Sequence, residues 1–271
     1  MTVCLECVVF TIKGTLIENN KYISIFYIWL SLCIKNSGLG KDDQIRIKID
    51  SDTFEHCKQN MLFTGLLTHS ACPVKIILFP PPNDVIDGMM IRFKKVAYTQ
   101  DIFMYSDIDI LIIKPIHALF TSITENSIGV HIEGLINDIN YGACFTEEEL
   151  AVLTPESPGC SSGKFIIYGK ELYSDFLDIV TTIYTKDKLY YCHDQTFYNK
   201  ALYLLDKQKY KLTALDQSVL SINGHLYTPH TILLDVMGMP GDGQIHFDKM
   251  LMFSLLHHSN LLDTILLQAK A

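Results

Sequence analysis

One stretch of this chain carries its strongest structural and chemical signal, the sequence YSDIDILIIKPIHALF at residues 105–120. Upstream, residues 101–105 are apolar and β-favouring, which is typical of a strand buried on both faces. Two carboxylates one residue apart, Asp107 and Asp109, stand where that strand ends. A second apolar run follows at 110–113, and a Lys-Pro pair stops it. The stretch therefore predicts a core strand with two acidic side chains at its carboxyl end.

The two aspartates allow two interpretations. Carboxylates are unfavourable to bury, so a pair at the end of a core strand needs a counter-charge. A hard divalent cation that keeps several waters and also touches a substrate phosphate supplies one. The alternative is a simple turn, because Ser-Asp-x-Asp often ends a strand and caps the next element. The pair by itself leaves both interpretations open.

The whole stretch resembles the YLDADILVLKPIDELF segment of nucleotide-sugar glycosyltransferases with the GT-A fold, of the glycogenin and galactinol-synthase type. The likeness extends through the Lys-Pro pair to the terminal Leu-Phe, so it is more specific than a bare D-x-D motif. The resemblance implies transfer of a hexose from a UDP-sugar to a hydroxyl of a glycan or protein acceptor, with retention of configuration. It also implies Mn²⁺ or Mg²⁺ as cofactor, held by Asp107 and Asp109, with Asp107 also touching the donor.

Three further segments resemble parts of the same family. In IRFKKV (91–96), Arg92 matches a basic residue that reaches the donor sugar and a carboxylate; otherwise it belongs to a solvated basic face. In CSSGKFII (160–167), Ser161 or Ser162 stands where the family's NSGVFL segment has the Asn that contacts a sugar, and we take Ser162 as the candidate. The alternative is a flexible loop at 155–164 entering a strand at 165–168. In YCHDQTFYN (191–199), Asp194 and Gln195 match the DQDxxN segment and would hold the sugar face as catalytic residues; the alternative is that Asp194 is a helix N-cap.

The C-terminal part matches the family less closely. The resemblance places a metal ligand where the sequence reads DVMG at 235–238, so Asp235 would replace the family's histidine as third ligand. An all-oxygen set suits Mn²⁺ or Mg²⁺. His230 and His246 are alternatives for that ligand, and Lys249 would bind the diphosphate.

The N-terminal part supplies candidate contacts for the uridine. Residues 3–12 read as a buried strand, and ligands of α/β sheets gather at the carboxyl ends of such strands. Thr11, in the turn at 11–15, is therefore a candidate uridine contact, although many such turns only change direction. Tyr22 begins an apolar helix at 22–35 and either stacks on the base or packs in the core.

Alternation of strands and helices predicts one α/β sandwich around a mostly parallel sheet flanked by helices, and the resemblance adds its GT-A (Rossmann-like) form. We expect a single domain over 1–271, with a nucleotide-binding half at about 1–120 and an acceptor and metal-closing half at about 121–271. The expected remaining strands are 44–49, 74–79 and 127–132, and the expected remaining helices are 53–67, a short acidic one within 137–149, 172–184 and 251–267.

Composition excludes several classes of protein. Of 271 residues, 48% are hydrophobic and 19% charged, as in a globular protein with a sizeable core. A net charge of −8 argues against a nucleic-acid partner. The eight cysteines show no disulfide framework, and Cys4 and Cys7 are better explained as core thiols than as a zinc or redox pair. Without a signal peptide or membrane span we expect a cytoplasmic enzyme, and the 251–267 helix offers a homodimer interface.

Two other functions remain open at this stage. A sugar-1-phosphate nucleotidyltransferase shares the general sheet and an aspartate metal site, but its Gly-rich basic loop is missing from residues 3–16. A non-catalytic sugar- or nucleotide-binding protein on a transferase scaffold would explain the departures at Ser162 and Asp235.

Overall fold

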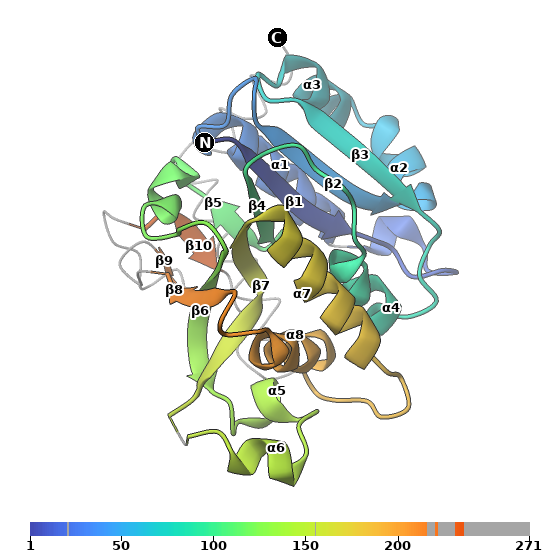
Figure 1. The fold of residues 1–271 in the computed structure, drawn as a ribbon. Helices are drawn as coiled ribbons and strands as arrows, with labels where there is room; N and C mark the ends of the chain where they lie inside the picture. Colours follow the sequence, from blue (N-terminus) through green and yellow to red (C-terminus); the bar gives the residue numbers. More distant parts are fainter. Residues whose placement is uncertain (21, 155, 216–219, 222–230, 236–271) are drawn as a thin grey trace.

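A computed structural model describes residues 1–20, 22–154, 156–215, 220–221 and 231–235, and its centre is a seven-stranded sheet (Figure 1). In spatial order the strands are β3 (Val74–Phe79), β2 (Gln44–Asp50), β1 (Val3–Val9), β4 (Ile102–Ser106), β7 (Pro158–Tyr168), β6 (Ser127–Leu135) and β8 (Lys211–Ala214). All neighbouring pairs are parallel except the two made by β7, which is antiparallel to both β4 and β6. The sheet is therefore mostly parallel, as predicted, with one reversed strand.

Helices cover both faces of this sheet. One face packs against α1 (Tyr22–Asn36), α2 (Ser51–Lys58) and α3 (Met61–His69). The other packs against α4 (Val85–Met90), the 3₁₀ turn η2 (Ile91–Phe93), α7 (Lys170–Ile183) and α8 (His193–Leu204), and Figure 1 shows α7 and α8 in front of the sheet with α1 behind it. Side chains of β1 alternate between the two cores, because successive residues of a strand point to opposite faces.

A second, three-stranded sheet lies beside the end of β4. It has the order β5 (Ile110–Ile112), β10 (Leu233–Asp235) and β9 (Leu220–Ser221), with β10 antiparallel to β5. The register pairs Asp235 with Ile110, which brings Asp235 next to the aspartate pair. The remaining short elements are η1 (Ile17–Asn19), η3 (Ile116–Phe120), α5 (Ile139–Gly142) and α6 (Glu147–Ala151).

Two predicted elements are wrong. The helix expected at 53–67 is two helices, α2 and α3, because the Asn60 side chain accepts a hydrogen bond from the Leu62 amide and starts a new helix. The loop expected at 155–164 is largely strand, since β7 already begins at Pro158. Its glycines let the backbone approach neighbours closely: a Cβ on Gly159 would lie 2.5 Å from the ring of Tyr141.

Within the described part of the chain, no helix is long and apolar enough to cross a membrane. All eight cysteines lie in that part and are free thiols. Cys4 and Cys7 are buried on opposite faces of β1, each within a hydrophobic core. The core-thiol interpretation is therefore confirmed for this pair.

Candidate active site

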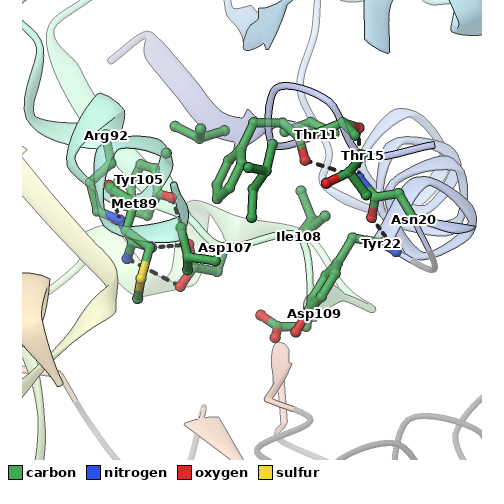
Figure 2. Close-up of a pocket in the computed structure, with 16 residues that line it drawn as sticks. Thr11, Thr15, Asn20, Tyr22, Met89, Arg92, Tyr105, Asp107, Ile108 and Asp109 are labelled. Carbon is green, nitrogen blue, oxygen red and sulfur yellow. Dashed lines mark hydrogen bonds and ion pairs between the residues drawn. The ribbon is translucent and has the colours of Figure 1, made fainter. Parts of the chain in front are cut away.

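A cavity of about 540 Å³ opens at the carboxyl ends of β1 and β4 (Figure 2). Parallel strands of an α/β sheet present their ligands at this edge. The predicted residues Thr11, Tyr22, Arg92, Asp107 and Asp109 all line it. The other lining residues, mostly apolar, are Val8, Val9, Phe10, Ile12, Thr15, Asn20, Val85, Gly88, Met89, Tyr105 and Ile108.

Asp107 is fixed from three sides. The Tyr105 hydroxyl donates to its Oδ1 at 2.6 Å, and its own amide donates to the carbonyl of Gly163 at 2.7 Å. Gly163 lies on the reversed strand β7, and a Cβ there would stand 2.8 Å from Asp107 Oδ2. The aspartate side chain is 28% exposed, so it remains accessible from the cavity. A tight backbone approach by β7 thus holds Asp107 in one orientation.

Arg92 binds two carboxylates at once. Its Nη2 lies 3.1 Å from Asp107 Oδ1, and its Nη1 lies 3.2 Å from both Asp107 Oδ2 and Asp194 Oδ2. The guanidinium also stacks over the Tyr105 ring, with the central carbon 5.0 Å from the ring centre. Arg92 is 7% exposed, so the alternative of a solvated basic face is wrong for this residue.

Asp194 and Ser162 meet beside Arg92. Ser162 Oγ donates to Asp194 Oδ2 at 2.9 Å, and both side chains are buried. The N-cap of α8 is Cys192, so the interpretation of Asp194 as a capping residue is wrong. Gln195 links two elements: its Oε1 accepts from the Ser162 amide and its Nε2 donates to the Asn140 carbonyl, both at 3.3 Å.

Acidic side chains gather around Arg92 and shift each other's pKa values. Burial raises the pKa of Asp107 to about 6; Arg92 acts to lower it, and the neighbouring Asp109 acts to raise it further. For Arg92, burial favours the neutral form, but the carboxylates of Asp107 and Asp194 hold its pKa above the ordinary value. The Arg92 guanidinium thus contacts two carboxylates, those of Asp107 and Asp194, and Asp109 adds negative charge close to Asp107.

The opposite end of the cavity is lined by uncharged polar side chains, with the Asp50 carboxylate bound behind them. Thr11 Oγ1 accepts from Asn20 Nδ2 at 2.8 Å and from Thr53 Oγ1 at 2.7 Å, and the Thr11 amide donates to Asp50 Oδ2 at 2.9 Å. Tyr22 is 43% exposed at the cavity rim, so the alternative of a core aromatic is wrong. This end offers apolar walls with a few fixed hydroxyl and amide groups.

Asp235 is held by a buried lysine. Lys164 Nζ lies 2.5 Å from Asp235 Oδ2 and 2.7 Å from Glu133 Oε1. Burial raises the pKa of Asp235 to about 7; Lys164 acts against this, while Asp109 adds to it. Asp235 therefore lies within electrostatic reach of the aspartate pair, but its side chain already has a cationic partner.

The carboxylates suit a metal ion of one kind. Among the described residues, no three His, Cys, Asp or Glu side chains are grouped closely enough to hold an ion by themselves. Mg²⁺, however, is usually held by one or two carboxylates together with substrate phosphates and water. Asp107 and Asp109, both lining the cavity, are an oxygen pair of that type.

Three predicted residues, Lys249, His230 and His246, lie outside the described residues, as does the helix expected at 251–267. Sequence reasoning missed Tyr105 and Lys164. Tyr105 stands two residues before Asp107 on an extended strand, so the strand period indicates that both side chains share a face. Lys164 interrupts an otherwise small and apolar run, and a buried cation there signals buried carboxylates.

The strand order, the reversed β7 and the cavity at the carboxyl edge define the class of fold as the GT-A form of the α/β sandwich. Among solved structures, the chain is similar to mouse xyloside xylosyltransferase 1 in its apo form, with a TM-score of 0.53 and 14% sequence identity. The similarity covers 90% of this chain and 98% of the mouse chain. No protein family and no curated protein matches the sequence. The predicted fold class is confirmed.

Proposed function

We propose that this protein is a glycosyltransferase that moves a sugar from a UDP-sugar donor to a hydroxyl acceptor. The observation that carries the proposal is the arrangement of the cavity. One cavity joins a neutral end at Thr11 and Tyr22 to an acidic end at Asp107 and Asp109, with Arg92 beside it. A nucleoside diphosphate sugar has the same sequence of parts: a flat base, a charged diphosphate and a polar sugar. The structural neighbour is named a xylosyltransferase, which agrees with this class.

The donor would lie along the cavity with its base near Tyr22. An exposed aromatic ring at a cavity rim can stack on a base, and fixed groups such as Thr11 and Asn20 can bind its edge. The diphosphate would then reach Asp107 and Asp109. Arg92 and Asp194, deeper behind Asp107, would face the sugar. This placement uses the predicted donor residues Thr11, Tyr22, Arg92 and Asp107, while Ser162 would act through Asp194.

Asp107 and Asp109 would hold Mn²⁺ or Mg²⁺, and Asp235 is the proposed further ligand if it exchanges Lys164 for the ion. When bound, the ion would neutralise the charge that develops on the leaving diphosphate. Arg92 would keep Asp107 ionised and oriented through its two N–H contacts. Two positive charges, the Arg92 guanidinium and the bound ion, would then lie near the diphosphate on which negative charge develops.

The chain's own groups can hold the reacting sugar. The Asp194 carboxylate, fixed by Arg92 and Ser162, would hold sugar hydroxyls and stabilise positive charge developing at the anomeric carbon. Gln195 would hold the same sugar face. We propose retention of configuration, with the leaving phosphate accepting the proton of the acceptor hydroxyl, so that no separate protein base is needed. A hexose remains the proposed sugar.

A donor-release assay tests the function. Purified protein with Mn²⁺ is offered UDP-glucose, UDP-galactose, UDP-N-acetylhexosamines, UDP-xylose and GDP-sugars, and free nucleoside diphosphate is measured. We expect release from one UDP-sugar. Asp109→Asn should reduce this release at least a hundredfold, because the variant lacks one of the two carboxylate ligands proposed for the ion. Asp42→Asn, an exposed carboxylate in the turn before β2, is the matched control and should keep full activity.

The same assay separates the other functions. Pyrophosphate release from UTP and a sugar-1-phosphate, with no UDP release from any donor, would favour a nucleotidyltransferase. UDP binding in the presence of Mn²⁺ without turnover on any donor would favour a non-catalytic binding protein. Absence of both binding and turnover would reject the proposed site.

A further inference from the structure

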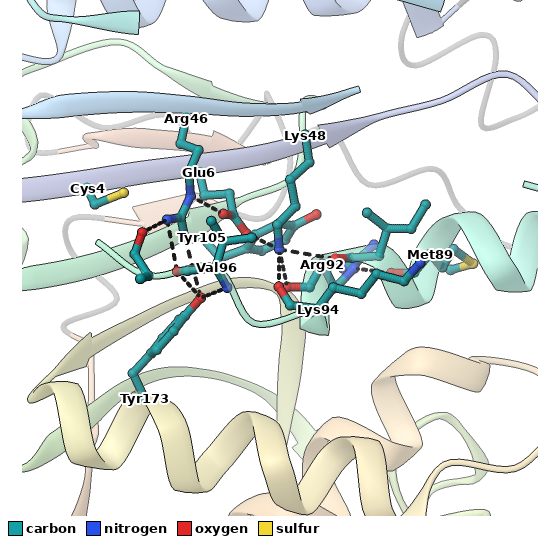
Figure 3. A network of polar contacts seen from close by, with 12 residues as sticks. Cys4, Glu6, Arg46, Lys48, Met89, Arg92, Lys94, Val96, Tyr105 and Tyr173 are labelled. Carbon is teal, nitrogen blue, oxygen red and sulfur yellow. Dashed lines mark hydrogen bonds and ion pairs between the residues drawn. The ribbon is translucent and has the colours of Figure 1, made fainter. Parts of the chain in front are cut away.

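A buried ionic cluster lies on the α7 side of the sheet, behind the candidate active site (Figure 3). It consists of Glu6 on β1 and Arg46 and Lys48 on β2, all at most 1% exposed. The parallel register pairs Glu6 with Arg46, and Lys48 follows two residues later on the same face. Glu6 Oε2 lies 2.5 Å from Arg46 Nε, and its Oε1 lies 2.8 Å from Lys48 Nζ.

The cluster contains more positive than negative charge, and main-chain carbonyls compensate for the difference. Lys48 Nζ donates to the carbonyls of Ile91, Arg92 and Lys94, at 3.1, 3.3 and 2.7 Å. The three carbonyls match the three N–H donors of the ammonium, and Glu6 pairs with it as a counter-charge. Arg46 Nη1 donates to two carbonyls further along the same segment, those of Val96 and Ala97, at 3.0 and 3.1 Å.

The segment that receives these bonds has little regular structure of its own. Beyond the single turn η2, residues 94–97 are in neither helix nor strand. Buried carbonyls need partners, and here side chains supply them in place of a backbone ladder. Tyr173 on α7 closes the other side, since its hydroxyl donates to the Val96 carbonyl at 3.1 Å. The position of this segment therefore depends on the cluster.

The same segment carries Arg92. The Lys48 ammonium binds the carbonyls of Arg92 itself and of its neighbour Ile91. From this backbone the guanidinium reaches Asp107 and Asp194. A chain of direct contacts thus runs from Glu6 and Lys48, through the main chain, to the carboxylates of the cavity.

We propose that Lys48 is a positioning residue for Arg92: by binding the carbonyls around Arg92, it fixes the backbone from which the guanidinium orients Asp107 and Asp194 toward the donor. The inference rests on the proposed function and deepens it. Stability alone does not account for the cluster, because well-packed apolar residues of similar size are often as stabilising as a buried ionic group. A buried lysine with four oxygen partners does determine one conformation of the segment that it binds.

Lys48→Met tests the inference, because methionine keeps the volume and loses the ammonium. Phe63→Leu is the control: Phe63 is buried under α1 on the opposite face of the sheet, and its substitution lowers stability without touching the segment. For each variant we would measure the melting temperature, the dissociation constant of UDP with Mn²⁺, and amide hydrogen exchange of residues 91–97.

We expect Lys48→Met to weaken UDP binding about tenfold and to speed exchange in 91–97, while Phe63→Leu stays within twofold of wild type in binding. The double variant Lys48→Met/Arg92→Lys should lose clearly less UDP affinity than the product of the two single-variant losses, because both changes disturb the same side chain. Two results would overturn the inference. One is a double variant whose loss of UDP affinity equals the product of the two single losses, and the other is an equal loss of UDP affinity in Lys48→Met and Phe63→Leu.

Two further results keep the test decisive. If Lys48→Met does not fold, Tyr173→Phe removes the hydroxyl that binds Val96 and Arg46, and it should weaken UDP binding two- to threefold with faster exchange in 91–97. Unchanged binding in that variant would count against the inference. If wild-type protein binds no UDP, the proposed function fails and the inference fails with it; if it does bind and Lys48→Met binds equally well, the inference alone fails.

Discussion

At the scale of single residues, Arg92 is the group on which the candidate site depends most. It is almost fully buried and is bound by Asp107 and Asp194, while the Ser162 carbonyl accepts a further N–H at 3.2 Å. A planar guanidinium can serve these partners together, because its donors are fixed in a fork. A lysine in the same place has the charge without that geometry.

We therefore predict different losses for two substitutions of Arg92. Arg92→Met leaves the buried Asp194 carboxylate without its cation, and we expect a loss of about 3 kcal/mol in the free energy of unfolding. Arg92→Lys keeps the charge and should lose only about 1 kcal/mol, yet it should weaken nucleotide binding because the fork is lost. Urea unfolding at pH 7 and calorimetric titration with UDP measure the two effects. Equal destabilisation by Met and Lys would contradict this account.

At the scale of elements, the reversed strand β7 is what completes the site. It contributes Ser162 to Asp194, the Gly163 carbonyl to the Asp107 amide, and Lys164 to Asp235. Three successive residues of one strand thus contact three different acidic residues. The small residues of β7 permit this, because larger ones would push the strand away from the end of β4.

Gly163→Ala tests the close approach of β7. The added methyl would stand 2.8 Å from Asp107 Oδ2, and this short side chain cannot yield freely because Arg92 and Tyr105 hold it. We expect UDP affinity to fall at least fivefold as Asp107 is displaced, with a loss of stability of about 1–3 kcal/mol. Gly40→Ala is the control, since its nearest neighbouring atom is 4.0 Å away. Unchanged affinity in Gly163→Ala would show that Asp107 tolerates the shift.

Sequence patterns predicted the elements that have a clear period or a strong motif. Strands β1 to β4, helix α1 and the acidic pair at the end of β4 were all predicted close to their observed bounds. The prediction that 74–79 is buried is wrong, because β3 is an edge strand of the sheet and Leu78 is 54% exposed. The break between α2 and α3 was missed because apolar residues continue across it, and a single asparagine cap divides the run. Residues 158–164 of β7 were missed because Pro, Gly and Ser usually indicate loops; here they are needed for close packing.

At the scale of the whole molecule, stability should depend on pH through the buried acids. The raised pKa of Asp235, about 7 through burial, means that the folded protein keeps a proton that the unfolded chain loses near its ordinary value of 3.8. Stability from this group is present below about pH 4 and is lost as the pH rises through about 7, by at most about 4 kcal/mol. Asp107, with its pKa raised to about 6, acts in the same direction.

Chemical unfolding in a chelating buffer between about pH 4 and pH 7.5 measures this dependence. Glu133, His131 and His193, whose pKa values are lowered in the folded protein, act in the opposite direction in both wild type and variant. We therefore compare the two proteins: the unfolding free energy of the wild type should fall relative to that of Asp235→Asn, which cannot ionise, as the pH rises across the interval. Asp42→Asn, which is exposed, should follow the wild type. A difference between wild type and Asp235→Asn that stays constant over the interval would contradict the raised pKa of Asp235.

The molecule as a whole also shows where sequence reasoning stops. Two features of the described seven-stranded sheet bring the site together: the order of its strands and the reversed direction of β7. Because of them, residues up to 102 positions apart in the chain meet, namely Arg92, Asp107, Ser162 and Asp194. Local periodicity has no information on such pairings. The resemblance to a family indicated these residues one by one, and the sheet order explains why they belong to one site.

Helix α1 packs its buried Trp29 against the end of β4, where the indole Nε1 donates to Ser106 Oγ at 3.4 Å. Trp29 is the single tryptophan of the chain, and Ser106 immediately precedes Asp107. All tryptophan fluorescence of the protein therefore comes from a side chain that contacts the residue next to Asp107. Any ligand or substitution that shifts the end of β4 would change the emission of that one indole, so the chain contains its own unlabelled optical reporter of events at the cavity.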